Sequence, residues 1–177
     1  MKKLLLPLIC LLVAAGANAQ VFNTGATLKK ETFSIGVEPV FINNVDGFML
    51  FAHAGYGLKQ GITIGVSAGM LNGQYFGANV KWAMAKYISL TTGAHFWGDF
   101  GLDGMLNLTF PIKSDSRIFT GVDADINFPK SGVNVPIMIP VGVQIGLRKN
   151  MAFILEGEIG VTKTAYNMLG GGVVVYF

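Results

Sequence analysis

The stretch Ile62-Thr63-Ile64-Gly65-Val66-Ser67-Ala68-Gly69-Met70 places an apolar side chain at every second position and a small or polar one between. Successive side chains of a β-strand point to opposite faces, so this alternation predicts a strand with one apolar face and one polar face. Turn-forming residues lie on both sides, because Lys59-Gln60-Gly61 precedes the stretch and Asn72-Gly73 follows it. The stretch therefore predicts one strand of an antiparallel sheet with short connections.

The same alternation recurs along most of the chain, again between short turn-like connections. It predicts ten strands, which cover residues 32–41, 48–58, 62–71, 74–83, 87–97, 102–111, 117–128, 136–148, 151–163 and 168–177. Pro136 and Pro140 weaken the start of the eighth strand, because proline cannot donate a hydrogen bond to a ladder. If a hairpin is lost there, the alternative count is eight strands.

The composition does not fit an ordinary soluble domain. Charged residues make up 13% of the chain, against about 25% in typical soluble proteins. No apolar run after residue 19 reaches the length of about 20 residues that a membrane-spanning helix needs. The 24 glycines also disfavour helices. An apolar chain of this kind is expected to be all-β.

Volume decides which strand face points outward. Ten strands with four or five large apolar side chains each would bring roughly 45 of them into one barrel interior, which a small barrel cannot hold. The other face carries Gly, Ser, Thr, Asn and a few charges, and this composition suits a cramped polar lumen. We therefore expect a closed antiparallel up-and-down transmembrane β-barrel with short loops, in which every backbone group is paired.

The first 19 residues have the pattern of a secretory signal peptide. Lys2 and Lys3 precede an apolar run at 4–13, and Ala17-Asn18-Ala19 is a small-x-small cleavage site. We expect cleavage near Ala19, a short N-terminal periplasmic segment at 20–31, and a single barrel domain at 32–177.

The only cysteine, Cys10, lies within this predicted signal. A lipoprotein signal is the alternative reading of Cys10, but Ile9 before it is not the small residue that such signals use. Cleavage would leave no thiol for disulfides, catalysis or metal binding. It would also remove two of the 13 Lys and Arg residues and leave a nearly neutral chain, so we expect no nucleic-acid partner.

The C-terminal stretch Gly170-Gly171-Gly172-Val173-Val174-Val175-Tyr176-Phe177 alternates and ends in an aromatic residue. With the signal and the strand pattern, it resembles the small bacterial outer-membrane β-barrel family, which is porin-like, over residues 20–177. In that family a similar terminal strand is read by the barrel-assembly machinery. The resemblance implies that Val173, Val175 and Phe177 form this assembly signal. It also implies that the protein comes from a Gram-negative bacterium and lies in the outer membrane in contact with lipids. Periplasmic chaperones would be its partners during export.

An even number of strands places both termini on the periplasmic side, so strand direction brings His95, Asp103 and Asp125 together near the outer end. A histidine beside carboxylates can act as a general base on water. Omptin-type outer-membrane proteases use a similar His/Asp arrangement at the barrel rim. Lipid A deacylases use a His/Ser/Glu set, which His53, Ser67 and Glu156 resemble.

A structural interpretation of the inward polar residues is favoured over catalysis, because buried charges need partners. It predicts a polar network in the lumen that forms a salt-bridged plug; a charged narrow pore is the functional alternative. The predicted network contains Glu38, His53, Lys81, Asp123, Gln144, Arg148, Glu156 and Glu158.

Aromatic residues near the predicted strand ends are expected to form interfacial girdles. These residues are Phe48, Trp82, Phe96, Trp97, Phe110, Phe128 and Tyr166. No phosphate-binding loop, zinc spacing or nucleophile elbow is present in the sequence, so we expect no cofactor and no metal.

The sequence is compatible with three functions. The first is a non-catalytic outer-membrane barrel with a structural or envelope role and at most narrow permeability to small solutes. The second is a hydrolase at the barrel rim, either omptin-like or lipid A deacylase-like. The third is a soluble β-barrel that binds an apolar ligand.

Overall fold

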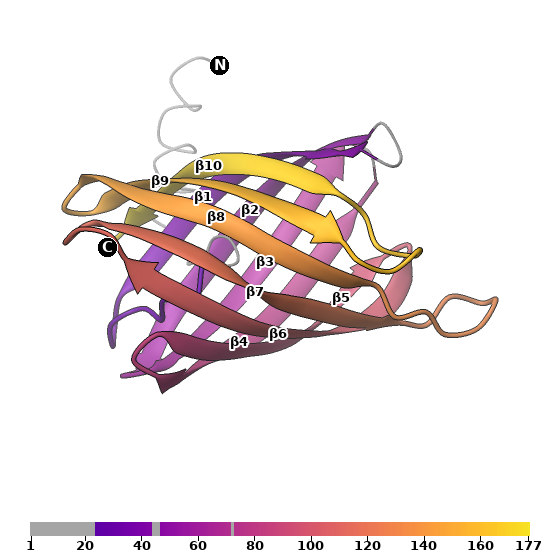
Figure 1. The fold of residues 1–177 in the computed structure, drawn as a ribbon, viewed down its shortest axis with the longest axis horizontal. Helices are drawn as coiled ribbons and strands as arrows, with labels where there is room; N and C mark the ends of the chain where they lie inside the picture. Colours follow the sequence, from indigo (N-terminus) through magenta and orange to yellow (C-terminus); the bar gives the residue numbers. More distant parts are fainter. Residues whose placement is uncertain (1–23, 44–46, 72) are drawn as a thin grey trace, which may run out of the picture.

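The computed structural model describes residues 24–43, 47–71 and 73–177, which form one closed barrel of ten antiparallel strands (Figure 1). The strands are β1 (Phe33–Ile42), β2 (Gly47–Lys59), β3 (Ile62–Leu71), β4 (Tyr75–Ala85), β5 (Ile88–Trp97), β6 (Asp99–Pro111), β7 (Ser116–Asn127), β8 (Ile137–Arg148), β9 (Met151–Gly160) and β10 (Met168–Tyr176). Each strand pairs with its neighbours in the chain, and β10 pairs with β1 to close the barrel. The predicted fold class and strand number are confirmed, and the eight-strand alternative is wrong.

Among the described residues, no helix is long and apolar enough to cross a membrane. The predicted signal peptide at 1–19, with Cys10, lies outside the described residues.

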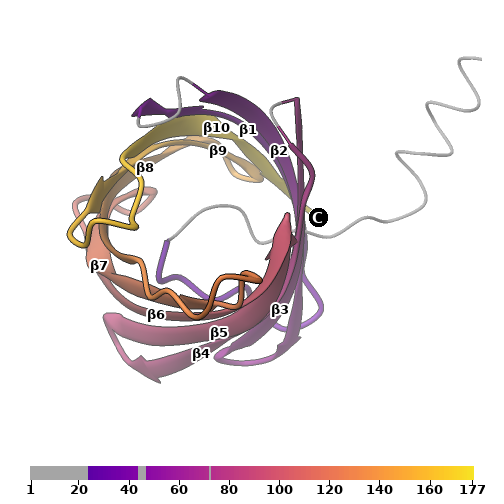
Figure 2. The ribbon, with the colours of Figure 1, turned by 90° about the vertical axis from the view of Figure 1, so that its right-hand side faces the viewer.

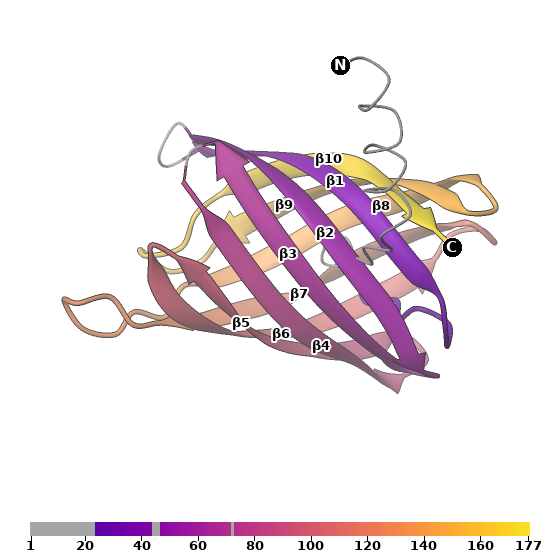
Figure 3. The same cartoon turned by 180° about the vertical axis from the view of Figure 1, so that it is seen from behind.

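The two ends of the barrel differ in their connections. The terminal end holds the start of β1, the chain terminus at Phe177 and short turns such as 60–61 and 149–150. The opposite end, here called the loop end, holds the longer connections 128–136 and 161–167. The views from both sides show the 128–136 connection extending furthest beyond the strands (Figures 1 and 3). This asymmetry resembles that of bacterial outer-membrane barrels, which have short periplasmic turns and longer extracellular loops.

The two faces of the strands are arranged as predicted. On β3, Val66 points outward and is 53% exposed, whereas Thr63 points into the lumen and is fully buried. The same alternation leaves large aliphatic and aromatic side chains exposed on the outside of every strand, including Val122, Val141 and Ile159. The outer wall is therefore apolar, and most of the polar side chains of the strands face inward.

Two prolines lie at gaps in the strand pairing. In the β1–β10 ladder, Val37 pairs with Val173 and Val40 with Gly170, and no pair is formed at the positions between, which include Pro39. The β7–β8 ladder has a similar gap between the pairs made by Val141 and Met138, and Pro140 lies within it. Proline has no N–H to donate, which explains both gaps. Pro140 nevertheless lies inside β8, so this strand is not replaced by a loop.

Strand boundaries differ from the prediction by three residues at two hairpins, and by at most two residues elsewhere. β6 begins at Asp99 and not at 102, because Gly98 has a φ of 73° and allows Trp97 to pair directly with Asp99 across a tight turn. β9 ends at Gly160 and not at 163. There the Gly160 N–H donates to the side chain of Asn167 at 3.0 Å, and the Ala165 N–H donates to the Thr162 carbonyl at 3.1 Å. These bonds form a turn before β10.

Candidate functional site

The segment that precedes β1 folds back into the lumen from the terminal end. The reversal takes place at Glu31, whose φ is 60° and whose N–H donates to the Gly57 carbonyl at 2.8 Å. A side chain at position 57 would collide with the Lys29 carbonyl, so glycine is required for this close approach. Seen along the barrel from the loop end, the segment lies inside the ring of strands (Figure 2).

Polar side chains of β3, β4 and β6 hold this segment. The Gly25 N–H donates to Thr109 Oγ1 at 2.9 Å, and the Leu28 N–H donates to Thr63 Oγ1 at 2.8 Å. The ammonium of Lys81, which is only 1% exposed, donates to the Thr24 carbonyl and lies within electrostatic reach of Glu156. The sequence predicts a periplasmic segment at 20–31 before the barrel and indicates no partner for it in the lumen. Thr63, Lys81 and Thr109 are visible in the sequence as inward polar residues of β3, β4 and β6, but no periodic pattern links them to an irregular segment.

An apolar cluster fills the lumen opposite this segment. It contains Phe119 of β7, Ala152 and Ile154 of β9, and Val174 of β10. A side chain at Gly142 would meet the Phe119 ring, so this glycine leaves the space that the ring occupies. We call the N-terminal segment and this cluster together the septum, which comprises residues 24–28, Lys81, Phe119, Ala152, Ile154 and Val174. The structure places one cavity on each side of it, and no described residue lines both.

The cavity at the loop end is strongly acidic, and we call it the acidic chamber. It has a volume of about 230 Å³ and is lined by the two histidines His53 and His95. Its six carboxylates come from β1, β6, β7 and β9; they are Glu38, Asp103, Asp123, Asp125, Glu156 and Glu158. Among the described residues, no Lys or Arg lines it. Its electrostatic field therefore favours cations.

Aromatic side chains surround the chamber near its mouth. The Trp97 and Tyr166 rings lie 5.4 Å apart between centroids, and Phe51 meets Tyr75 edge-on at 5.2 Å. The girdle prediction is wrong for Trp97 and Tyr166, because both line the chamber. Trp97 is two residues from His95 on β5 and shares its inward face, and Tyr166 belongs to the connection before β10.

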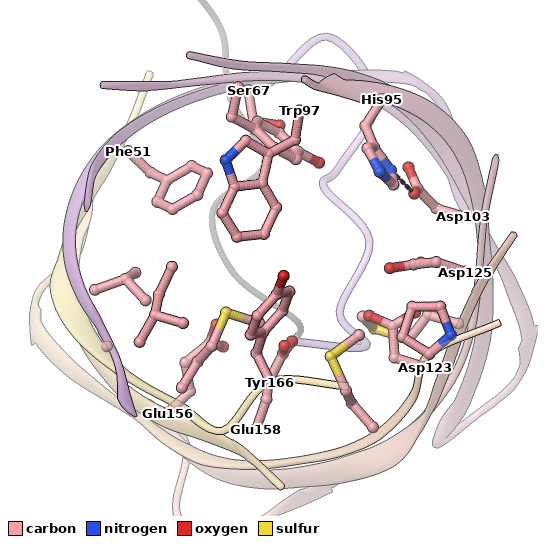
Figure 4. Close-up of a pocket in the computed structure, with 18 of the residues that line it drawn as sticks. Phe51, Ser67, His95, Trp97, Asp103, Asp123, Asp125, Glu156, Glu158 and Tyr166 are labelled. Atoms are coloured by element: carbon pink, nitrogen blue, oxygen red, sulfur yellow. Dashed lines mark hydrogen bonds and ion pairs between the residues drawn. The ribbon is translucent and has the colours of Figure 1, made fainter. Parts of the chain in front are cut away.

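His95, Asp103 and Asp125 meet at one corner of this chamber, as the strand directions predict (Figure 4). Asp103 and Asp125 are directly opposite each other on β6 and β7, and Nδ1 of His95 contacts Oδ1 of Asp103. The donor atoms of the three side chains all lie within 4.8 Å of one another. Asp123 lines the same chamber two residues from Asp125, on the same face of β7. We call these four residues the His95 corner.

The second histidine belongs to a different part of the chamber. His53 Nε2 lies 3.1 Å from Glu38 Oε2, and Glu156 lines the same cavity. Ser67 is directly opposite His53 on β3. The three residues of the deacylase-like set, His53, Ser67 and Glu156, therefore line the same cavity, with Glu38 as the carboxylate that His53 contacts.

The cavity at the terminal end has the opposite charge. It has a volume of about 410 Å³, it is lined by Lys29, Arg117 and Lys149, and among the described residues no Asp or Glu lines it. Gln144 lies here and donates to the Tyr176 hydroxyl at 3.1 Å. We call this cavity the basic vestibule. The sequence shows lysines and arginines near the ends of the predicted strands. Their clustering at the terminal end of the barrel depends on the register between the strands, which the sequence pattern does not determine.

The residues of the predicted polar network are thus distributed over three levels of the lumen. Glu38, His53, Asp123, Glu156 and Glu158 line the acidic chamber, Lys81 belongs to the septum, and Gln144 lines the basic vestibule. Arg148 departs from the prediction, because it is exposed at the end of β8 and lines neither cavity. Its position on the last residue of the strand places it outside the enclosed lumen.

Comparison with known proteins identifies the fold. No protein-family model and no curated protein sequence matches the chain. Among solved structures, the NanC porin has a TM-score of 0.55 at 8% identity, with 80% of this chain and 98% of that chain covered. The KdgM porin has a TM-score of 0.51 at 12% identity, with 81% of this chain and 99% of that chain covered. The chain therefore has the fold of a small, porin-like outer-membrane β-barrel.

Proposed function

We propose that this protein is an outer-membrane β-barrel of a Gram-negative bacterium with a structural or envelope role, whose lumen allows at most narrow passage of small solutes. The observation that carries the proposal is the septum. The contacts of Thr24, Gly25 and Leu28 with Lys81, Thr109 and Thr63 hold the chain's own N-terminal segment inside the barrel. A lumen occupied in this way is poorly suited to bulk diffusion.

The apolar outer wall supports a membrane location. Outward side chains such as Val122 and Val141 are about half exposed without a bilayer around them. Apolar surfaces of this extent mark contacts with membranes or other proteins. The loop end would face the cell exterior, because longer connections lie on that side in outer-membrane barrels. The acidic chamber would then open outward and the basic vestibule would open to the periplasm.

The opposed charges of the two cavities also argue against free ion flow. A cation favoured by the acidic chamber next meets Lys81 in the septum and then Arg117 and Lys149 in the basic vestibule. An anion meets the same charges in the reverse order. Neither sign of charge has a continuously favourable path, unlike a porin channel lined to attract its solute.

Fractionation tests the membrane location. We expect the protein to sediment with outer membranes, to need detergent for extraction, and to migrate differently in gels before and after boiling. Recovery in the soluble periplasmic fraction would reject the location. Planar-bilayer recordings of the same preparation test the closed lumen, for which we expect little or no conductance; large, stable currents from the wild-type chain would reject it.

A second candidate function, hydrolysis at the outward end, is favoured by the contact between His95 and Asp103. A carboxylate that orients an imidazole is a common feature of general-base sites. If the His95 site cleaves a peptide, as the omptin-like arrangement implies, His95→Ala should abolish the activity and His53→Ala should preserve it. Activity that survives in purified His95→Ala would exclude this site. The third hypothesis, a soluble barrel for apolar ligands, gains no support from a charged lumen and an apolar exterior.

A further inference from the structure

From the geometry of the His95 corner we infer that it is a binding site for one divalent transition-metal ion. Imidazole nitrogen of His95 and carboxylate oxygens of Asp103 and Asp125 would be the ligands, and the carboxylate of Asp123 in the same cavity would add to the attraction for the ion. This inference goes beyond the proposed envelope role, because it needs only the folded barrel and not a particular cellular location.

The three principal ligands are already gathered by the strand pairing. Their donor atoms lie within 4.8 Å of one another, and a tetrahedral metal with bonds of about 2.0–2.2 Å holds its ligands roughly 3.3–3.6 Å apart, so the side chains would close by about 1 Å. The movement is small because all three side chains extend from neighbouring strands into one cavity. Binding would replace the hydrogen bond between His95 and Asp103 by bonds from both residues to the ion.

Asp123 provides an independent sign that a cation is needed here. It is only 8% exposed, it lines the acidic chamber, and its Oδ1 has no hydrogen-bond partner among the described residues. A buried carboxylate oxygen without a partner is costly. No Lys or Arg of the described chain lines the chamber to compensate it. Figure 4 shows Asp123 beside Asp125 on the wall next to the His95–Asp103 contact.

The ligand types indicate which ions fit. Imidazole suits zinc and other transition metals, whereas Ca²⁺ and Mg²⁺ prefer sites made only of oxygen. One nitrogen with two or three carboxylate oxygens is a combination that Zn²⁺ accepts, with water at any remaining position. The sequence shows no metal-binding spacing because the ligands come from β5, β6 and β7 and not from one local motif.

Calorimetric titration of the detergent-folded full-length barrel with Zn²⁺, after removal of bound metal with a chelator, tests the inference. We expect one Zn²⁺ per barrel, weaker binding of Ca²⁺, and a loss of affinity of about tenfold or more in Asp125→Asn and His95→Asn. His53→Asn is the matched control, since it removes the other histidine of the same chamber, and it should bind like the wild type. Heat-modifiable migration confirms that each variant is folded.

The coordination can be observed without relying on affinity. The imidazole NMR signals of His95 should shift at one equivalent of Zn²⁺, and those of His53 should not. Absence of Zn²⁺ binding by the folded wild-type barrel would overturn the inference. Binding that survives both Asp125→Asn and His95→Asn, or that is lost in His53→Asn, would also overturn it by placing the ion elsewhere.

Discussion

Lys81 shows how a single inward side chain can determine the state of the lumen. Its ammonium is fully enclosed and donates to the Thr24 carbonyl, so it attaches the N-terminal segment to β4. The amides of Gly25 and Leu28 donate to threonines on β6 and β3 and depend on the same docked position. The septum is therefore sensitive to this one charge.

Lys81→Met should loosen the N-terminal segment while leaving the strands intact. Hydrogen bonds to charged groups contribute about 1.5–3 kcal/mol, and each 1.4 kcal/mol corresponds to about a factor of ten in an equilibrium. We expect hydrogen exchange at Gly25 and Leu28 to become about ten times faster or more. Lys113→Met, which changes an exposed lysine in the β6–β7 turn, should leave it unchanged. Equal exchange in the Lys81→Met and wild-type barrels would show that the contact does not hold the segment.

Phe119 of β7 belongs to the apolar cluster that completes the septum opposite the N-terminal segment. Its ring is 2% exposed and packs with Ile154 and Val174. Phe119→Ala should lower the free energy of unfolding by about 3–5 kcal/mol, because the removed ring leaves a cavity. Denaturant unfolding in detergent, followed by tryptophan fluorescence, measures the loss. Phe76→Ala removes an outward ring that leaves no enclosed cavity and should cost less; an equal cost for both variants would contradict the packing role.

At the residue scale, the sequence predicts the face of a strand residue and not its partner. The period-2 alternation correctly predicts that His95, Asp103 and Asp125 face inward, and the strand directions correctly predict that they lie close together. The inward position of Trp97 follows from the same alternation and was missed, because an aromatic residue near a strand end also fits an interfacial girdle. Contacts with residues 24–28 could not be predicted, since no periodic signal links an irregular segment to a sheet.

At the element scale, the ten strands were predictable because each has a long alternating pattern and a polar or glycine-containing connection. The two prolines show the limit of such patterns. Pro140 was expected to weaken its strand, but β8 continues through it because the missing N–H falls at a gap in one ladder only. Whether a ladder has a gap opposite a proline depends on the register of the two paired strands. The sequence pattern of one strand does not determine that register.

The last strand carries the predicted assembly signal. Val173 faces outward and is 40% exposed, and Phe177 follows β10 at the edge of the basic vestibule and is 63% exposed. The Phe177 N–H donates to the Phe33 carbonyl at 2.8 Å, next to the seam between β1 and β10. We propose that these residues and Val175 are recognised during insertion. Phe177→Ser should reduce the fraction of heat-modifiable protein in cells, whereas Leu147→Ser, at another exposed outward position, should have little effect. An unchanged folded fraction in Phe177→Ser would argue against this signal.

At the scale of the whole molecule, an apolar exterior and a polar, charged interior reverse the arrangement of a soluble barrel. This inversion could be predicted from composition and side-chain volume alone. The division of the lumen into an acidic chamber, a septum and a basic vestibule could not, because it arises from the register of ten strands and from the folded-back segment.

The inversion predicts a depth-dependent response to charge on the outer wall. Val122 is near the middle of β7 and faces outward, so Val122→Arg should destabilise the barrel in phospholipid vesicles by about 2–4 kcal/mol. Val133 is 64% exposed in the 128–136 connection, and Val133→Arg should change the stability by less than about 0.5 kcal/mol. Denaturant unfolding from vesicles compares the two variants. Similar effects at both positions would mean that β7 does not lie in the hydrocarbon layer.

The most direct test of the closed lumen is a planar-bilayer recording of three folded chains: the wild type, a variant that lacks residues 24–28, and a control that lacks residues 130–134 of the longest connection. Heat-modifiable migration establishes that each chain forms a barrel before it is recorded. We expect stable single-channel steps only from the variant without residues 24–28, and a silent or barely conducting lumen in the other two. Equal conductance of the wild type and the 24–28 deletion, whether high or absent, would contradict closure by the N-terminal segment.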